Sequence, residues 1–129
     1  MTSLFAYLSY RDAPSAIDWR EAIGFQVVAR QPGDDGSILH AELRLGGAVV
    51  MLATDDADYG VPPLVGDSTG SGLYLLVDDV DAIYTAAIEA GATALLEPQT
   101  TAWGTERARV LDPEGREWSF GTYEPGGGW

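Results

Sequence analysis

The stretch DAPSAIDWREAIG, residues 12–24, has a counterpart of the same design in DVDAIYTAAIEAG, residues 79–91. In each stretch the opening Asp can accept hydrogen bonds from the free backbone N–H groups at the start of a helix. The closing Gly can adopt the left-handed conformation that ends a helix. The two stretches therefore predict helices over residues 13–23 and 80–90.

Strand-like runs surround both predicted helices in the same order. In the first half we expect strands at 4–10, 25–30, 37–46 and 48–54; in the second half we expect them at 72–77, 93–97, 106–111 and 117–123. Each half then reads as a β-α-β-β-β module, and neither module alone could bury the apolar face of its sheet. The sequence predicts an α+β fold made of two tandem modules.

The domain organisation follows from where this repeated pattern stops. We expect one domain over residues 1–129, with module one at 4–54, a linker at 55–71, module two at 72–123 and a flexible tail at 124–129. The linker is rich in Gly and Pro and has no periodic pattern. Trp129 would be ordered only if it found a groove to fill.

Composition excludes several classes of chemistry. The chain has no cysteine and its seven basic residues are all arginines, which excludes thiol nucleophiles, thiolate metal sites, Schiff bases and phosphate-loop lysines. The single histidine excludes a site that needs two imidazoles from one chain. No apolar run is long enough to span a membrane and no signal sequence opens the chain, so we expect a cytoplasmic protein.

The net charge of −13 bears on the partners. Nucleic acid and anionic membranes need a basic surface, so the charge argues against both. It would favour a cationic ligand. The alternative is an acidic surface that only keeps the protein soluble, and the charge alone fits this alternative better.

Three further motifs carry a resemblance to a known family. They are Gly24-Phe25 after the first helix, residues 77–81 entering the second, and Asp112-Pro113-Glu114-Gly115 before the last strand. With the two modules, they resemble the vicinal oxygen chelate superfamily, which includes glyoxalase I, extradiol dioxygenases, fosfomycin-resistance enzymes and bleomycin-resistance proteins. The resemblance implies the glyoxalase/bleomycin-resistance fold, in which a curved mixed sheet surrounds a ligand cup, usually within a homodimer.

The resemblance also implies where a metal would bind. Enzymes of the family hold a divalent metal with one side chain from the first and the last strand of each module, usually His, Gln or Glu. In this sequence those positions correspond to Phe5, Met51, Gly72 and Ser119. None is a carboxylate or an imidazole, and the nearby Glu117 supplies only one carboxylate. We therefore expect neither the family's metal nor another cofactor.

His40 is the strongest polar candidate. Strand alternation places His40, Glu42 and Arg44 on one face of their strand, and Leu39, Ala41, Leu43 and Leu45 on the face that a helix would cover. His40 could then hydrogen-bond a ligand or transfer a proton, tuned by Glu42. The alternative is a solvated strand face that carries a charge pair.

Aromatic and apolar residues near the implied metal positions suggest a lined pocket. Replacing polar ligands by Phe, Met and Gly creates apolar space that suits a flat or hydrophobic molecule. The predicted ligand-binding residues are Phe5, Tyr7, His40, Glu42, Met51, Tyr74, Trp103, Glu117 and Ser119. The alternative for the aromatic residues is ordinary core, which we expect for Trp118, while Trp103 fits either interpretation.

Two classes of function follow. The first is a protein similar to the bleomycin-resistance branch, which binds a small molecule of cationic or aromatic character, an antibiotic or a metabolite, in an apolar cup without metal. The second is an enzyme of the lyase, isomerase or dioxygenase type that uses a non-standard site around His40, Glu42 and Glu117. The homodimer is implied by the resemblance alone.

Overall fold

The computed structural model describes residues 3–55 and 71–127. The chain divides into two compact units, Met1–Pro62 and Pro63–Trp129. Nearly all of the linker predicted at 55–71 lies outside the described residues, as does Trp129. In the part of the chain that is described, neither helix is long and apolar enough to cross a membrane.

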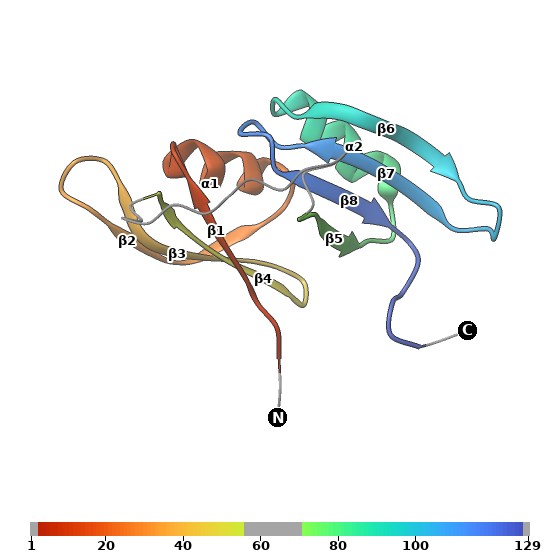
Figure 1. Cartoon of the computed structure of the whole chain (residues 1–129), viewed down its shortest axis with the longest axis horizontal. Helices are drawn as coiled ribbons and strands as arrows, with labels where there is room; N and C mark the ends of the chain where they lie inside the picture. Colours follow the sequence, from red (N-terminus) through yellow and green to blue (C-terminus); the bar gives the residue numbers. More distant parts are fainter. Residues whose placement is uncertain (1–2, 56–70, 128–129) are drawn as a thin grey trace. The chain divides into compact units, whose positions relative to one another are not determined.

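The first unit is a four-stranded mixed sheet with one helix (Figure 1). Its elements are β1 (Ala6–Tyr10), α1 (Ala13–Ala22), β2 (Gln26–Pro32), β3 (Ile38–Leu45) and β4 (Ala48–Thr54). The strand order in the sheet is β1-β4-β3-β2, with β1 parallel to β4 and the other pairs antiparallel.

The second unit repeats this arrangement. Its elements are β5 (Leu73–Leu76), α2 (Val80–Glu89), β6 (Thr93–Thr100), β7 (Glu106–Leu111) and β8 (Glu117–Gly121). The order β5-β8-β7-β6, again with the first pair parallel, matches that of the first sheet. The predicted α+β fold of two β-α-β-β-β modules is confirmed.

The predicted helix signals act as expected. Asp12 Oδ1 accepts a hydrogen bond from the Ser15 backbone N–H at 3.1 Å, and Asp79 Oδ1 accepts one from Ala82 at 3.0 Å. The Ser15 hydroxyl also donates to Asp12, and these two bonds lower the pKa of the Asp12 carboxyl. Gly24 and Gly91 have φ of +115° and +108°, values that favour glycine.

Each helix covers one face of its own sheet, and the cores lie there. Helix α2 packs on β6, β7 and β8. The fully buried side chains of the second unit include Val110, Trp118 and Phe120, while Ile17, Leu43 and Leu52 are fully buried in the first. The core prediction for Trp118 is confirmed.

Strand β3 departs from the predicted alternation at one end. Ala41 and Leu43 are fully buried as expected, but Leu39 is 52% exposed. The register shifts there, because Gln31 pairs with His40 while the next residue, Pro32, pairs with Ile38. This bulge leaves Leu39 without a partner on β2 and turns Ile38 into the core, so the expected position of Leu39 is wrong.

The turn between β7 and β8 explains the Asp112-Pro113-Glu114-Gly115 motif. Asp112 Oδ1 accepts hydrogen bonds from the backbone N–H groups of Glu114 and Arg116 at 3.1 and 3.0 Å. Its Oδ2 accepts one from Trp118 Nε1 at 3.1 Å. Gly115 has φ of +87°, which favours glycine in this turn. The motif therefore fixes both the turn and the largest side chain of the core.

Candidate functional site

A cavity of about 510 Å³ lies in the second unit. This volume suits a small organic molecule. Strands β5, β6, β7 and β8 contribute to its wall together with the loop between β6 and β7. The aromatic and larger apolar residues of the lining are Tyr74, Leu96, Trp103, Phe120 and Tyr123; its charged residues are Glu106, Arg107 and Arg109.

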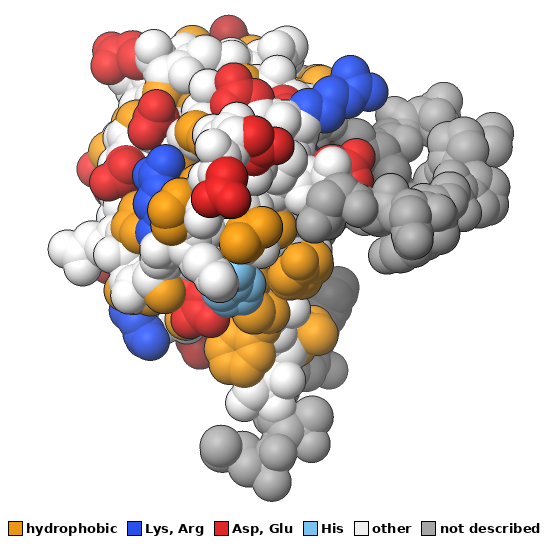
Figure 2. Space-filling model, turned by 90° about the vertical axis from the view of Figure 1, so that its left-hand side faces the viewer, with side chains coloured by type: hydrophobic (Ala, Val, Ile, Leu, Met, Phe, Trp, Pro, Cys, Tyr) orange, Lys and Arg blue, Asp and Glu red, His pale blue; other side chains and the backbone are white. Residues whose placement is uncertain are grey.

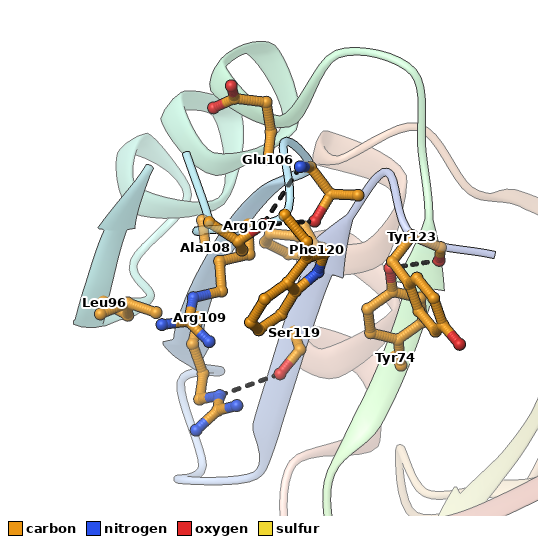
Figure 3. A pocket seen from close by; sticks show the side chains of 12 residues that line it. Tyr74, Leu96, Glu106, Arg107, Ala108, Arg109, Ser119, Phe120 and Tyr123 are labelled. Atoms are coloured by element: carbon orange, nitrogen blue, oxygen red, sulfur yellow. Dashed lines mark hydrogen bonds between the residues drawn. The ribbon is translucent and has the colours of Figure 1, made fainter. Parts of the chain in front are cut away.

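The strand register explains why distant residues meet in this cavity. Tyr74 on β5 pairs with Ser119 on β8, Ser119 pairs with Arg109 on β7, and Arg109 pairs with Leu96 on β6. Directly paired residues point to the same face of a sheet, so these four side chains form a row across it (Figure 3). Arg107 lies two residues before Arg109 and therefore shares this face.

Tyr74 is held over a glycine. Its hydroxyl donates a hydrogen bond to the backbone carbonyl of Tyr123 at 2.6 Å (Figure 3). A Cβ added at Gly121 would lie 2.5 Å from the Tyr74 hydroxyl oxygen, so glycine is needed there to leave room for the ring. Partial burial raises the pKa of the Tyr74 hydroxyl above its ordinary value.

The arginines of the cavity have neutral partners. Arg109 Nε donates to Ser119 Oγ at 2.9 Å, and Arg107 Nη2 donates to Gln99 Oε1 at 3.2 Å. Glu106 instead accepts a hydrogen bond from the Thr100 hydroxyl at 2.6 Å. In Figure 3 the Glu106 carboxylate is turned away from the Arg109 guanidinium.

Three of the residues predicted to bind a ligand meet in this cavity: Tyr74, Trp103 and Ser119. Sequence reasoning missed Leu96, Arg107, Arg109 and Tyr123. The alternation of Arg107 and Arg109 with the buried Ala108 and Val110 was the available signal, because it places both arginines on the face away from the helix.

Several predicted residues lie together on the sheet of the first unit. Met51 on β4 pairs with Tyr7 on β1 and with Glu42 on β3, which places these three in one row. His40 Nε2 lies 2.8 Å from Glu42 Oε2, so the two side chains share a face, and both are partly exposed. Figure 2 shows the histidine, in pale blue, bordered by hydrophobic side chains. Phe5 precedes β1 and is 53% exposed.

The positions that correspond to the family's metal ligands do not fit a divalent cation. A Cβ at Gly72 would lie 2.9 Å from Glu117 Oε2, so the space next to Gly72 is filled by that carboxylate. Ser119 Oγ accepts a hydrogen bond from Arg109 Nε, so a cationic side chain already occupies the space beside this hydroxyl. Within residues 3–55 and 71–127, no three His, Asp or Glu side chains come close enough to hold a metal.

A family model and a curated relative match most of this chain. The family model of the Glyoxalase/Bleomycin resistance protein/Dioxygenase superfamily matches residues 5–120. The chain is 36% identical to the uncharacterized protein Mb0911c of Mycobacterium bovis, over 92% of this chain and 82% of that protein.

Solved structures show the same fold. This chain is similar to TioX from Micromonospora sp. ML1, with a TM-score of 0.75 and 31% sequence identity. The match covers 96% of this chain and 100% of TioX. The bleomycin resistance determinant encoded on transposon Tn5 has the same fold, with a TM-score of 0.66 and 21% identity over 96% of this chain and 99% of that one. The chain belongs to the Glyoxalase/Bleomycin resistance protein/Dioxygenase superfamily.

Proposed function

We propose that this protein binds a small, flat, largely apolar molecule in the cavity of its second unit, without the metal of the family's enzymes. One observation carries the proposal: aromatic side chains line a cavity of about 510 Å³ around Ser119, the position where a metal ligand would stand. The row from Tyr74 to Leu96 offers an aromatic ring, a hydroxyl, a guanidinium and an aliphatic side chain to one ligand. Such a mixture suits binding and orientation of a ligand.

Trp103 is the side chain with most to gain from a ligand. It lines the cavity and is 69% exposed, although large aromatic side chains are usually much more buried. A flat molecule in the cavity would cover the indole, and removal of that apolar surface from water favours binding.

Replacing Trp103 by Ala should weaken the binding of an uncharged aromatic probe, 2-naphthalenemethanol, by about tenfold, because stacking and burial of an exposed indole contribute about 1 to 2 kcal/mol. Isothermal titration calorimetry measures this directly. Leu95→Ala is the matched control, since Leu95 is also exposed, at 47%, in the same unit but does not line the cavity. Equal losses in the two variants would place binding elsewhere.

The purified protein should contain no stoichiometric metal and should bind Ni²⁺, Zn²⁺ and Mn²⁺ only weakly. The reason is the donor set, in which Phe5, Met51, Gly72 and Ser119 replace carboxylates and imidazoles. Elemental analysis and calorimetric titration test this. Tight binding of one ion per chain that is lost in His40→Gln would overturn the metal-free proposal.

That outcome would favour the alternative, an enzyme of the lyase, isomerase or dioxygenase type. The contact of 2.8 Å between His40 and Glu42 supports it, because a carboxylate can orient an imidazole for proton transfer. Glu117, the third residue of that prediction, belongs to the second unit.

We propose a cytoplasmic homodimer whose ligand is an antibiotic or a metabolite, with no nucleic-acid partner. The net charge of −13 supports the last point. The predicted cationic character of the ligand also rests on the net charge of the chain. The affinity for a bound molecule, however, depends mainly on the charges of the side chains that contact it.

A further inference from the structure

The charged side chains around the cavity have the opposite balance to the whole chain. The chain carries a net charge of −13, yet two arginines and one glutamate line the cavity. The glutamate, Glu106, bonds to Thr100, and its carboxylate is turned away from Arg109 (Figure 3). A ligand in the cavity would therefore meet a local positive charge.

Arg109 has one hydrogen-bond partner among the described residues, Ser119. Its Nε–H donates to Ser119 Oγ at 2.9 Å, which holds the exposed guanidinium beside Ser119 on the sheet. Among the described residues, no carboxylate forms an ion pair with Arg109, and its terminal N–H groups have no protein partner. A guanidinium held in this way presents paired donors that match the two oxygens of a carboxylate.

Arg107 adds a second positive charge on the same face of β7. It is held by Gln99, a neutral partner, at 3.2 Å. Arg107 pairs across the sheet with Gly121, the glycine that leaves room for the Tyr74 ring. The cationic groups and the aromatic wall of the cavity are therefore neighbours.

We propose that the ligand is a flat aromatic molecule that carries a carboxylate, with Arg109 and Arg107 binding the anion and Trp103 and Tyr74 contacting the ring. This inference rests on the proposed function, because it names the ligand class of the same cavity. It reverses the charge expected from composition.

The net charge of the chain does not oppose this assignment strongly. Charges farther away than the Debye length, about 8 Å at physiological ionic strength, are largely screened. Arg107 and Arg109 are exposed in the free protein, and a ligand that covers their guanidinium groups would reduce this screening at the contact. The acidic surface should slow the approach of an anion more than it weakens the final contact.

Three probes that share one ring system test the charge. They are 2-naphthoate, 2-naphthalenemethanol and 2-naphthylmethylammonium, titrated by calorimetry at physiological salt. Naphthoate should bind at least about tenfold more tightly than the alcohol, since a hydrogen bond between charged groups contributes about that factor or more. The ammonium compound should bind most weakly.

Arginine variants locate the effect. Arg109→Gln should weaken naphthoate binding by about tenfold and change the affinity for the alcohol by less than about twofold. Arg109→Lys should weaken naphthoate binding by an intermediate factor, because lysine keeps the positive charge but lacks the paired N–H donors of the guanidinium. Arg107→Gln should show a smaller loss of the same kind. Arg30→Gln is the matched control, because it removes one positive charge from an exposed position on β2 and should change none of the three affinities.

The outcomes separate this inference from the proposed function. Equal affinities for the three probes, or tightest binding of the ammonium compound, would overturn the carboxylate assignment and leave binding in the cavity standing. A naphthoate loss in Arg30→Gln as large as in Arg109→Gln would also overturn it. Failure of all three probes to bind would contradict both proposals.

Discussion

Replacing Trp118 by Ala should lower the free energy of unfolding by about 4 kcal/mol, the largest single effect that we expect in this protein. Trp118 is 0% exposed and is the largest fully buried side chain. Loss of the indole would open a cavity under β8. It would also remove the N–H group that donates a hydrogen bond to Asp112. Urea unfolding followed by circular dichroism measures the change.

Two variants control for the type of residue. Trp103→Ala removes the same side chain from a position that is 69% exposed, and should change stability by less than about 0.5 kcal/mol. Trp118→Phe keeps much of the apolar volume and loses the indole N–H, so its loss should be well below that of Trp118→Ala. Similar destabilisation by Trp103→Ala and Trp118→Ala would contradict the burial described above.

Replacing Asp112 by Ala should lower the free energy of unfolding by about 3 kcal/mol, because three hydrogen bonds to one buried carboxylate are lost together. Asp112 is 2% exposed, so water does not readily replace the lost acceptor. The Trp118 indole N–H would then be buried without this partner. Thermal and urea unfolding should both show the loss.

Asp35→Ala is the matched control for Asp112→Ala. Asp35 Oδ1 accepts a hydrogen bond from the Ser37 backbone N–H at 3.2 Å in an exposed turn of the first unit. Water can satisfy that N–H after the substitution, so the effect on the free energy of unfolding should be small.

A double-mutant cycle of Asp112→Ala and Trp118→Phe should show coupling, since the two residues share a hydrogen bond. Additive losses would show that the shared bond contributes little.

Local signals in the sequence predicted the architecture well. Asp12 and Gly24, repeated as Asp79 and Gly91, marked both helices within one residue of their observed ends. Caps are set by neighbours along the chain, so a sequence displays them directly. Leu39 shows the limit, because its exposure depends on a bulge in its pairing with β2, a partner distant in sequence.

The candidate site was predicted in part. Tyr74, Trp103 and Ser119 were expected to bind a ligand and do line the cavity. Arg107 and Arg109 were missed, although they alternate with the apolar residues Ala108 and Val110 in the sequence. What the sequence could not give was the register that pairs Arg109 with Ser119 on one side and Leu96 on the other.

The sequence by itself determined the repeated α+β modules and the helix caps, because both depend on residue type and local spacing. Only the tertiary structure decided the local charge of the cavity. That local charge depends on which strands pair and in which register. Two arginines on one face of the sheet can make the cavity locally positive, although the whole chain carries a net charge of −13.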